Sequence, residues 1–288
     1  MRYFGTVIPK GITLLPDKPL QAVILAVEAA CRRAKRAPES VFGELIRQAI
    51  DEVLDGPRTG RFRLDQLDQT EKAYIGTRIE HIIQAFFGFG PGTLADVKIA
   101  DTDVDVKWSK TLDWMIAPEN VGGIILGIGL SKGEDQFSVG IFRASDAVLR
   151  KKGNRDGKRS LTAESREVEV SWLVRAASLP PNFLDQIPDS VRRAIFASTS
   201  AQQRMAILAR ELEGTAIPRS AFETIAQGRF DPMRRLRRDK GKVDPLGGMV
   251  FLSTKCGRQE LKRLGYKHFP KDHWIPVRAE ALAATDTP

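Results

Sequence analysis

The apolar run at residues 122–131, GGIILGIGLS, restricts the possible fold more than any other stretch of this chain. Ten consecutive residues without a charged side chain are typical of a strand that is buried on both faces of a sheet. A second apolar run, FSVGIFRAS, follows at 137–145, and the alternating REVEVSWLV at 166–174 predicts a later strand. The middle of the chain therefore predicts a sheet with a buried centre.

Helical periodicity precedes these strands. We expect a first helix over Leu20–Arg36 and a second from Pro38 to the turn at Asp55-Gly56-Pro57, because proline is tolerated in a first helical turn and Asp-Gly-Pro breaks a helix. Thr70 is expected to cap a third helix, which GFGPGT at 88–93 ends. Helical segments followed by strands predict an α/β fold in which helices flank a sheet.

The last part of the chain has a different, mainly helical character. The proline-punctuated stretch 177–190 is interpreted as an interdomain linker, with a poorly structured edge as the alternative, and a second domain is expected over residues 179–288. The elements expected in it are helices at Gln202–Leu212, Arg219–Gln227 and Asp231–Lys240, followed by a strand at 248–254. This order of helix, turn, helix, basic helix and strand is that of a winged helix-turn-helix domain.

The third of these helices, from the stretch DPMRRLRRDKGK at 231–242, is strongly basic. On a helix, Arg234, Arg237 and Arg238 project roughly together, and Arg235 lies to one side. Arginine can grip phosphate or read guanine edges in the major groove, so this face suits a recognition helix. A solvated basic helix without a partner is the alternative.

Charge and cysteine usage limit the functional class. The 288 residues carry a net charge of +9 with a pI of about 9.7, which favours a polyanionic partner without separating nucleic acid from membrane headgroups. No signal-peptide pattern opens the sequence, and the longest apolar stretch, Leu20–Ala30, is too short to span a bilayer, so no membrane association is expected. Cys31 and Cys256 lie far apart, which argues against a disulfide scaffold or a cysteine zinc site and favours a reducing cytoplasm.

Residues 101–110, DTDVDVKWSK, concentrate charge on one face of an expected hairpin between 96–99 and 102–108. Because side chains alternate along a strand, Asp101, Asp103, Asp105 and Lys107 share a face. Carboxylates this close repel one another unless a divalent cation or ordered water screens them, and Mg²⁺ prefers oxygen ligands. Asp-x-Lys triplets are common in charged proteins, so the pattern alone leaves open an acidic strand in water.

Two further carboxylates are placed to join this group. Asp96 lies on the other arm of the hairpin, and Glu80 adjoins the apolar side of the third helix, where an unpaired carboxylate would cost free energy. The competing interpretations are Asp101 as a turn residue, Asp103 as a solvated strand residue, and Glu80 as a surface partner of Arg78 or Lys72.

The order Glu80, Asp96 and then Asp105-Val106-Lys107 resembles the active site of the PD-(D/E)xK restriction nucleases and, among them, the NaeI family of type II endonucleases. The likeness covers most of the chain. It extends to DGPRTGR (55–61), DQTEK (68–72), WMIAPE (114–119), GNRDGK (153–158) and LPPN (179–182). The resemblance implies an endonuclease domain over 1–178, with a mixed sheet flanked by helices. It also implies a winged-helix, topoisomerase-like DNA-binding domain over 179–288.

Carried over to this sequence, the resemblance also implies the roles of the acidic residues. Asp96 and Asp105 would coordinate Mg²⁺, Glu80 would be a further acidic member, and Lys107 would be the catalytic lysine. Asp101 and Asp103 lie outside this core set.

The stretch DGPRTGR also faintly resembles the Lys-x-Asp-Gly-x-Arg motif of nucleotidyltransfer ligases, in which the lysine amine is the nucleophile. Here Val53 or Leu54 occupies that position, and neither can form a phosphoramidate, so ligase chemistry is not expected. Arg58 and Arg61 are expected to contact DNA phosphates near the cleavage site. The alternative is a turn with exposed arginines.

A second basic segment, KKGNRDGKR at 151–159, carries Lys151, Lys152 and Arg155, which we expect to contact DNA. The tip of a flexible hairpin is the alternative interpretation.

The predicted function is that of a type II site-specific restriction endonuclease: Mg²⁺-dependent hydrolysis of double-stranded DNA by a homodimer, with a second DNA site as effector on the family's pattern. Two other classes stay open, a DNA-binding regulator with a vestigial nuclease fold and a DNA repair nuclease. A topoisomerase would need a nucleophilic tyrosine, and Tyr3, Tyr74 and Tyr266 lie in no evident basic, metal-binding context.

Overall fold

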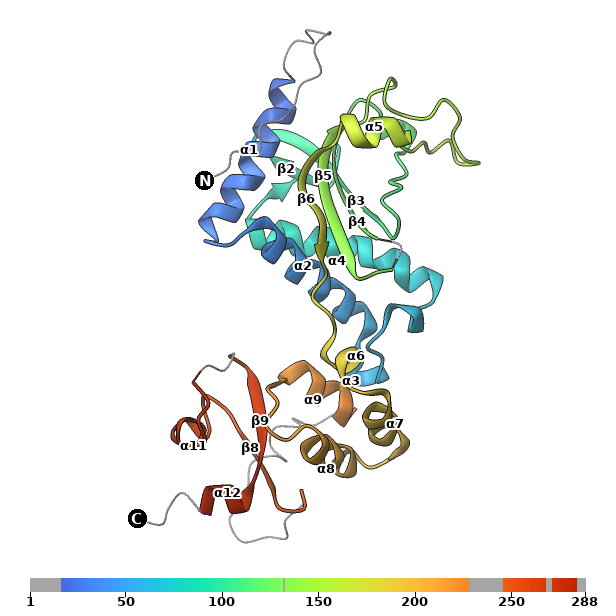
Figure 1. The fold of residues 1–288 in the computed structure, drawn as a ribbon. Helices are drawn as coiled ribbons and strands as arrows, with labels where there is room; N and C mark the ends of the chain where they lie inside the picture. Colours follow the sequence, from blue (N-terminus) through green and yellow to red (C-terminus); the bar gives the residue numbers. More distant parts are fainter. Residues whose placement is uncertain (1–16, 132, 228–245, 268–270, 284–288) are drawn as a thin grey trace. The chain divides into compact units, whose positions relative to one another are not determined.

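The computed structural model describes residues 17–131, 133–227, 246–267 and 271–283 (Figure 1). Contacts within the chain divide it into two units, the first formed by Met1–Gly43 with Glu80–Ser178 and the second by Glu44–Ile79 with Leu179–Pro288. Two long helices, α2 (Pro38–Leu54) and α4 (Gln69–Phe87), each supply residues to both units. Each unit therefore combines two separate segments of the sequence.

A six-stranded sheet forms the centre of the first unit, in the order β1-β2-β3-β4-β5-β6. The strands are β1 (Gly90–Pro91), β2 (Val97–Ile99), β3 (Thr102–Ser109), β4 (Ile124–Leu130), β5 (Gln136–Arg143) and β6 (Ser171–Ser178). β3 and β4 are parallel and the other neighbours are antiparallel, so the sheet is mixed. All seven residues of β4 and six of the eight in β5 are buried, which confirms the two central strands.

Helix α1 (Lys18–Arg33) contacts β2 and β5 of this sheet (Figure 1). Its N-cap residue, Asp17, accepts a hydrogen bond from the backbone N–H of Leu20 and forms an ion pair with Arg143 of β5, with its carboxylate oxygens 2.5 and 2.8 Å from the guanidinium nitrogens. One carboxylate thus starts the helix and attaches it to the sheet.

The strand predicted over 166–174 is wrong in its first half. Residues Ala163–Val168 form a short helix, α5, and β6 begins only at Ser171. The hydroxyl of Thr162 accepts a hydrogen bond from the backbone N–H of Ser165 at 3.0 Å and caps the helix. This cap outweighs a short alternation of apolar and polar residues.

The cap predicted for the third helix is also wrong. Asp68, not Thr70, precedes α4, and its carboxylate accepts from the backbone N–H of Glu71 at 2.8 Å. The Glu71 carboxylate in turn accepts from the backbone N–H of Asp68 at 3.0 Å. This reciprocal capping box satisfies two N–H groups that a helix start leaves free.

The second unit is mainly helical and has a small antiparallel sheet in the order β7-β9-β8. Its elements from the last part of the chain are α6 (Phe183–Gln186), α7 (Asp189–Ala197), α8 (Ala201–Glu211), β7 (Ile217–Pro218), α9 (Arg219–Ala226), β8 (Met249–Leu252), α11 (Arg258–Arg263), β9 (His273–Arg278) and α12 (Ala279–Ala283). β8 matches the strand predicted at 248–254. The basic helix predicted at Asp231–Lys240 lies outside the described residues.

The stretch 177–190 contains the boundary between the two units, between Ser178 and Leu179, but it consists mostly of regular elements and not of the linker that was predicted. β6 continues to Ser178, α6 follows, and α7 begins at Asp189. Leu184 and Ile187 are buried in the core of the second unit, beside Phe222 and Phe62. Burial of these apolar side chains stabilises the segment, although its prolines taken alone indicate irregular structure.

In the described part of the chain, no helix is both long enough and apolar enough to cross a lipid bilayer.

Candidate active site

Asp105 lies in the middle of β3, beside Ile125 of the parallel strand β4, and is only 4% exposed. Its two carboxylate oxygens have different partners. Oδ1 lies 2.6 Å from Nζ of Lys107, and Oδ2 accepts a hydrogen bond of 2.9 Å from the side-chain amide of Asn120. Lys107, two residues along the same strand, keeps 26% of its side chain exposed. The strand therefore places a buried acid and a partly exposed cation next to each other.

Asp96 reaches the same place from the adjacent strand. It immediately precedes β2, whose residue Val97 lies opposite Val104 of β3. Its Oδ2 accepts a hydrogen bond of 2.7 Å from the backbone N–H of Val106, and its carboxyl group also interacts directly with that of Asp105. The antiparallel hairpin predicted from the sequence is the reason that these two acids meet.

Burial is the main influence on the acidity of Asp105. It raises the pKa of Asp105 to about 6, because the charged form is poorly solvated. The hydrogen bond and charge of Lys107 lower this pKa, whereas the neighbouring Asp96 raises it. A buried carboxylate with a second acid beside it is stabilised by a nearby cation, because a positive charge offsets both the lost solvation and the repulsion.

Glu80 belongs to the same electrostatic neighbourhood. It is half-buried on α4, and its pKa is raised first by burial and then by the negative charge of Asp96, whereas His81 and Lys107 lower it. Within the first unit, Glu80 and Asp105 therefore each interact with Asp96 and Lys107.

The donor set fits Mg²⁺, which is commonly held by one or two carboxylates while it keeps several waters. Asp96 and Asp105 supply adjacent oxygen donors whose mutual repulsion a divalent cation would relieve. Within the described ranges, no three acidic, histidine or cysteine side chains converge on a single metal position. A metal-ligand role for Glu80 therefore stays a prediction.

The two other aspartates of the stretch have structural partners. Ala100 and Asp101 form the turn between β2 and β3, with φ angles of 48° and 60°, so Asp101 is the turn residue of the competing interpretation. The Asp103 carboxylate accepts hydrogen bonds from the backbone N–H groups of Thr93 and Leu94, at 2.8 and 3.2 Å. It anchors the loop before Asp96 instead of simply facing water.

Asn120 is the residue of this site that the sequence analysis missed. It ends a short 3₁₀ helix, η2 (Pro118–Asn120), 15 residues after Asp105. Asparagine at a loop position carries little chemical signal by itself. Its position directly after the family-like stretch WMIAPE was the one available indication.

The DGPRTGR stretch lies in the second unit, where it forms the short helix α3 (Gly56–Thr59). Arg61 donates from both terminal guanidinium nitrogens to the Glu71 carboxylate, at 2.9 and 2.8 Å, and from Nε to the Leu54 carbonyl. Arg58 is 84% exposed and pairs with Asp55. Its DNA contact stays a prediction, as does that of Arg61, whose donors already hold the turn together.

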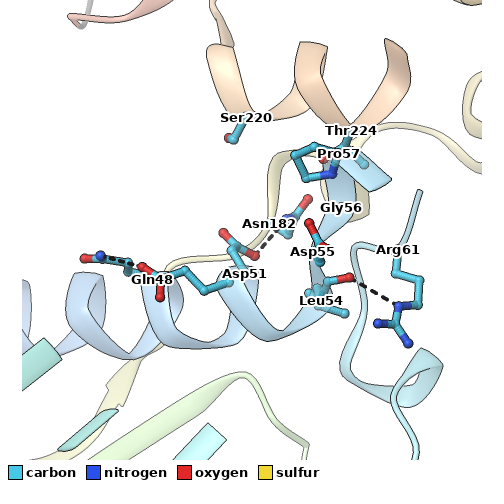
Figure 2. Close-up of a pocket in the computed structure, with 11 residues that line it drawn as sticks. Gln48, Asp51, Leu54, Asp55, Gly56, Pro57, Arg61, Asn182, Ser220 and Thr224 are labelled. Atoms are coloured by element: carbon cyan, nitrogen blue, oxygen red, sulfur yellow. Dashed lines mark hydrogen bonds between the residues drawn. The ribbon is translucent and has the colours of Figure 1, made fainter. Parts of the chain in front are cut away.

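A pocket borders this turn (Figure 2). Figure 2 shows Thr224 of α9 beside Pro57 of the turn, Ser220 farther along the same helix, and Asn182 donating to the carboxylate of Asp51. A side-chain carbon on Gly56 would lie 2.4 Å from the hydroxyl oxygen of Thr224, so glycine is required for this close packing. The pocket includes none of the four predicted catalytic residues.

The basic segment 151–159 belongs to the first unit and is an ordered loop. Lys151, Lys152 and Arg155 are all exposed, and the backbone N–H of Asn154 donates to the Lys158 carbonyl at 2.8 Å. Its base is fixed by two backbone hydrogen bonds between Ile116 and Arg159. The loop presents cations to solvent, as a phosphate contact requires, and its role with DNA stays a prediction.

The four arginines predicted for the recognition helix, Arg234, Arg235, Arg237 and Arg238, lie outside the described residues, so their role also stays a prediction.

Comparison with known proteins identifies the family of this chain. A family model described as restriction endonuclease NaeI matches residues 25–287. The type II restriction enzyme NaeI of Lentzea aerocolonigenes is 36% identical over 204 residues, which are 68% of this chain and 64% of that enzyme. The chain thus spans less than two thirds of that relative's length, whereas the family match covers both units and all four predicted catalytic residues. This chain belongs to the NaeI restriction endonuclease family.

Proposed function

We propose that the protein is a type II site-specific endonuclease that hydrolyses phosphodiester bonds in double-stranded DNA with Mg²⁺ as cofactor. The observation that carries the proposal is the buried Asp105 with Asp96 beside it and Lys107 2.6 Å away. Membership of a restriction endonuclease family supports the same reaction.

Asp96 and Asp105 are the residues proposed to hold Mg²⁺, with Glu80 as a further acidic group. When bound, Mg²⁺ supplies Lewis-acid stabilisation of the negative charge on phosphate oxygens. Lys107 is proposed to place its ammonium group against a phosphate oxygen. There its positive charge stabilises the negative charge that develops during in-line attack by water. Its partial exposure supports this role, because a fully buried ammonium could not reach the substrate.

Residues 179–288, the later segment of the second unit, are proposed to form a winged-helix DNA-binding domain. Its sheet order β7-β9-β8 and the preceding helices α8 and α9 support this assignment. Arg234, Arg235, Arg237 and Arg238 are proposed to contact DNA from the segment after α9. The Arg234→Ala, Arg238→Ala double variant tests this: unchanged DNA affinity across a salt series would refute it.

A homodimer is proposed, because two-fold symmetry places one active site at each strand of a palindromic target. A cytoplasmic location is proposed because the two widely separated cysteines favour a reducing compartment. A second DNA site that activates cleavage is a further part of the proposal, and it rests on the family resemblance alone. Plasmids that carry one or two target sites would test it, because activation requires faster cleavage of the two-site substrate.

The central test incubates the purified protein with plasmid DNA, with and without Mg²⁺, beside Asp105→Ala and Lys107→Ala variants. Discrete, metal-dependent fragments that both variants fail to produce are expected. Binding without cutting would favour a DNA-binding regulator, and metal-dependent cutting without discrete fragments would favour a repair nuclease. Equal behaviour of wild type and variants would refute the catalytic assignment.

A further inference from the structure

Asn120 donates from its side-chain amide to the second carboxylate oxygen of Asp105, at 2.9 Å. The other oxygen of that carboxylate is paired with Lys107. Both oxygens of the buried acid therefore have a donor, and the two donors come from different parts of the chain. A carboxylate that is held at both oxygens cannot rotate freely about its Cβ–Cγ bond.

The orientation of the Asn120 amide follows from chemistry. An asparagine side chain offers one donor group and one acceptor oxygen, and an ionised carboxylate only accepts. The amide nitrogen must therefore face Asp105, since the reverse orientation would bring two oxygens together. This leaves a defined interaction, in which a neutral donor fixes the carboxylate without cancelling its charge.

The backbone that carries Asn120 is held on both sides. Before it, Ile116 exchanges two backbone hydrogen bonds with Arg159, and the indole N–H of Trp114 donates to the carbonyl of Ile128 in β4 at 2.9 Å. After it, the Gly122 N–H donates to the Ala144 carbonyl at 2.8 Å. The amide is thus presented to Asp105 by a turn that the sheet itself supports.

Packing under this turn is equally tight. Trp114 lies directly over Gly127, where a side-chain carbon would come within 2.6 Å of the indole. Gly127 is the residue of β4 that pairs with Lys107 of β3. The same pair of strands therefore positions the lysine, the acid and the start of the segment that carries Asn120.

We propose that Asn120 is a positioning residue of the active site, which fixes the rotation of the Asp105 carboxylate and so presets it for a divalent cation. The assignment rests on the proposed nuclease function for its consequence in catalysis. Its effect on cation binding can be measured without any cleavage. A mere turn-forming role for Asn120 predicts loss of stability instead, with no selective effect on the cation.

The test compares Asn120→Leu, which keeps a similar volume without a donor, with Asn120→Gln, which keeps an amide donor. Glu119→Gln is the matched control, because Glu119 is an exposed neighbour on the same turn. Calorimetric titration with Ca²⁺ measures cation affinity in the full-length protein, and Asp105→Asn defines the heat that arises elsewhere. Steady-state cleavage in Mg²⁺ separates kcat from KM, and thermal melting reports on folding.

Asn120→Leu is expected to weaken Ca²⁺ binding and to lower kcat, each by about 10- to 100-fold, with KM for DNA nearly unchanged and the melting temperature lowered by only a few degrees. Asn120→Gln should recover part of both losses, and Glu119→Gln should match wild type. Unchanged Ca²⁺ affinity in Asn120→Leu, or an equal loss in all three variants, overturns the proposal.

The two hypotheses fail in different ways. If wild type binds Ca²⁺ at Asp105 and does not cut DNA, the proposed function is refuted, and the comparison of Ca²⁺ affinities still decides the role of Asn120. If wild type cuts DNA and Asn120→Leu cuts and binds Ca²⁺ equally well, the positioning role alone is refuted.

Discussion

The carboxylate of Asp96 accepts a hydrogen bond of 2.7 Å from the backbone N–H of Val106. This bond ties the residue just before β2 to the middle of β3, between Asp105 and Lys107 in sequence. Because Val106 is part of the sheet, the position of Asp96 depends on the backbone and not on a flexible side-chain partner. The hairpin thereby holds two acids together although their mutual repulsion opposes it.

Exchange of either acid for its amide tests this pairing. Asp105→Asn and Asp96→Asn are expected to reduce Mg²⁺-dependent cleavage by at least about 100-fold, because an amide carries no charge to hold the cation. Plasmid cleavage under single-turnover conditions measures the loss. Asp101→Asn is the matched control and should cleave like wild type, since asparagine tolerates the positive φ of 60° at that turn. Full activity of Asp105→Asn would contradict the assignment.

The raised pKa of Asp105 also predicts a pH-dependent cost in stability. Burial raises its folded-state pKa from 3.8 to about 6, so the folded protein holds a proton that the unfolded chain releases. Stability contributed by this group is therefore present below about pH 4, falls as pH rises to about 6, and stays low above it. The linkage amounts to at most about 3 kcal/mol.

Asp105→Asn removes this ionisation, so the variant should melt at a higher temperature than wild type above pH 7 without divalent cations. The difference should shrink toward pH 4 and also on addition of Mg²⁺, which stabilises the wild-type site. Melting curves in a chelating buffer across this pH range measure it. A variant that is less stable than wild type at pH 8 would show that the Lys107 ion pair outweighs burial and the repulsion from Asp96.

Local patterns predicted much of the first unit. The uncharged run at 122–131 and the alternation at 102–108 correspond to β4 and β3, because burial on both faces and the two-residue strand period leave direct traces in sequence. The alternation at 166–174 led to a wrong prediction because Thr162, four residues before the pattern begins, caps a helix through the backbone N–H of Ser165.

Non-local relationships were harder to predict. The resemblance, and not the spacing, selected Asp105 among three aspartates on alternate positions. In the structure the three differ in their surroundings: Asp101 lies in a turn, Asp103 holds a loop, and Asp105 is bonded to Asn120. The role of Asn120 could not be predicted from its position after WMIAPE, because that role depends on the parallel register of β3 and β4 and on the segment between them. Likewise, contacts place 44–79 with the last part of the chain although the sequence groups them with the first.

Arg61 and Arg58 are expected to differ although they stand in the same stretch. Arg61→Ala should lower the melting temperature by several degrees, because it removes the bidentate pair with Glu71 and the bond to the Leu54 carbonyl. Arg58→Ala should leave the melting temperature nearly unchanged, since its guanidinium is exposed and its pair with Asp55 is screened by solvent. An equal fall in both variants would argue against this division of roles.

The loop at 151–159 gives a prediction about salt dependence. Replacing Lys151, Lys152 and Arg155 together with alanine should weaken DNA binding and reduce the slope of log affinity against log salt by about 0.9 for each phosphate that these side chains neutralise. Fluorescence anisotropy at several salt concentrations measures this slope. The triple variant should fold normally, because these side chains are exposed and the loop is closed by backbone hydrogen bonds. An unchanged slope would show that the loop does not bind DNA.

Asp103 is expected to support catalysis indirectly through the loop that precedes Asp96. Its carboxylate holds the backbone N–H groups of Thr93 and Leu94, so Asp103→Ala should release this loop and lower kcat by about tenfold through misplacement of Asp96. Hydrogen exchange should become faster at those two amides, whereas Ser109, at the far end of β3, should be unaffected. Asp103→Asn keeps one acceptor oxygen and should retain part of the protection. If exchange accelerates while kcat stays at the wild-type value, the loop does not position Asp96, and the Val106 hydrogen bond alone is sufficient to hold it.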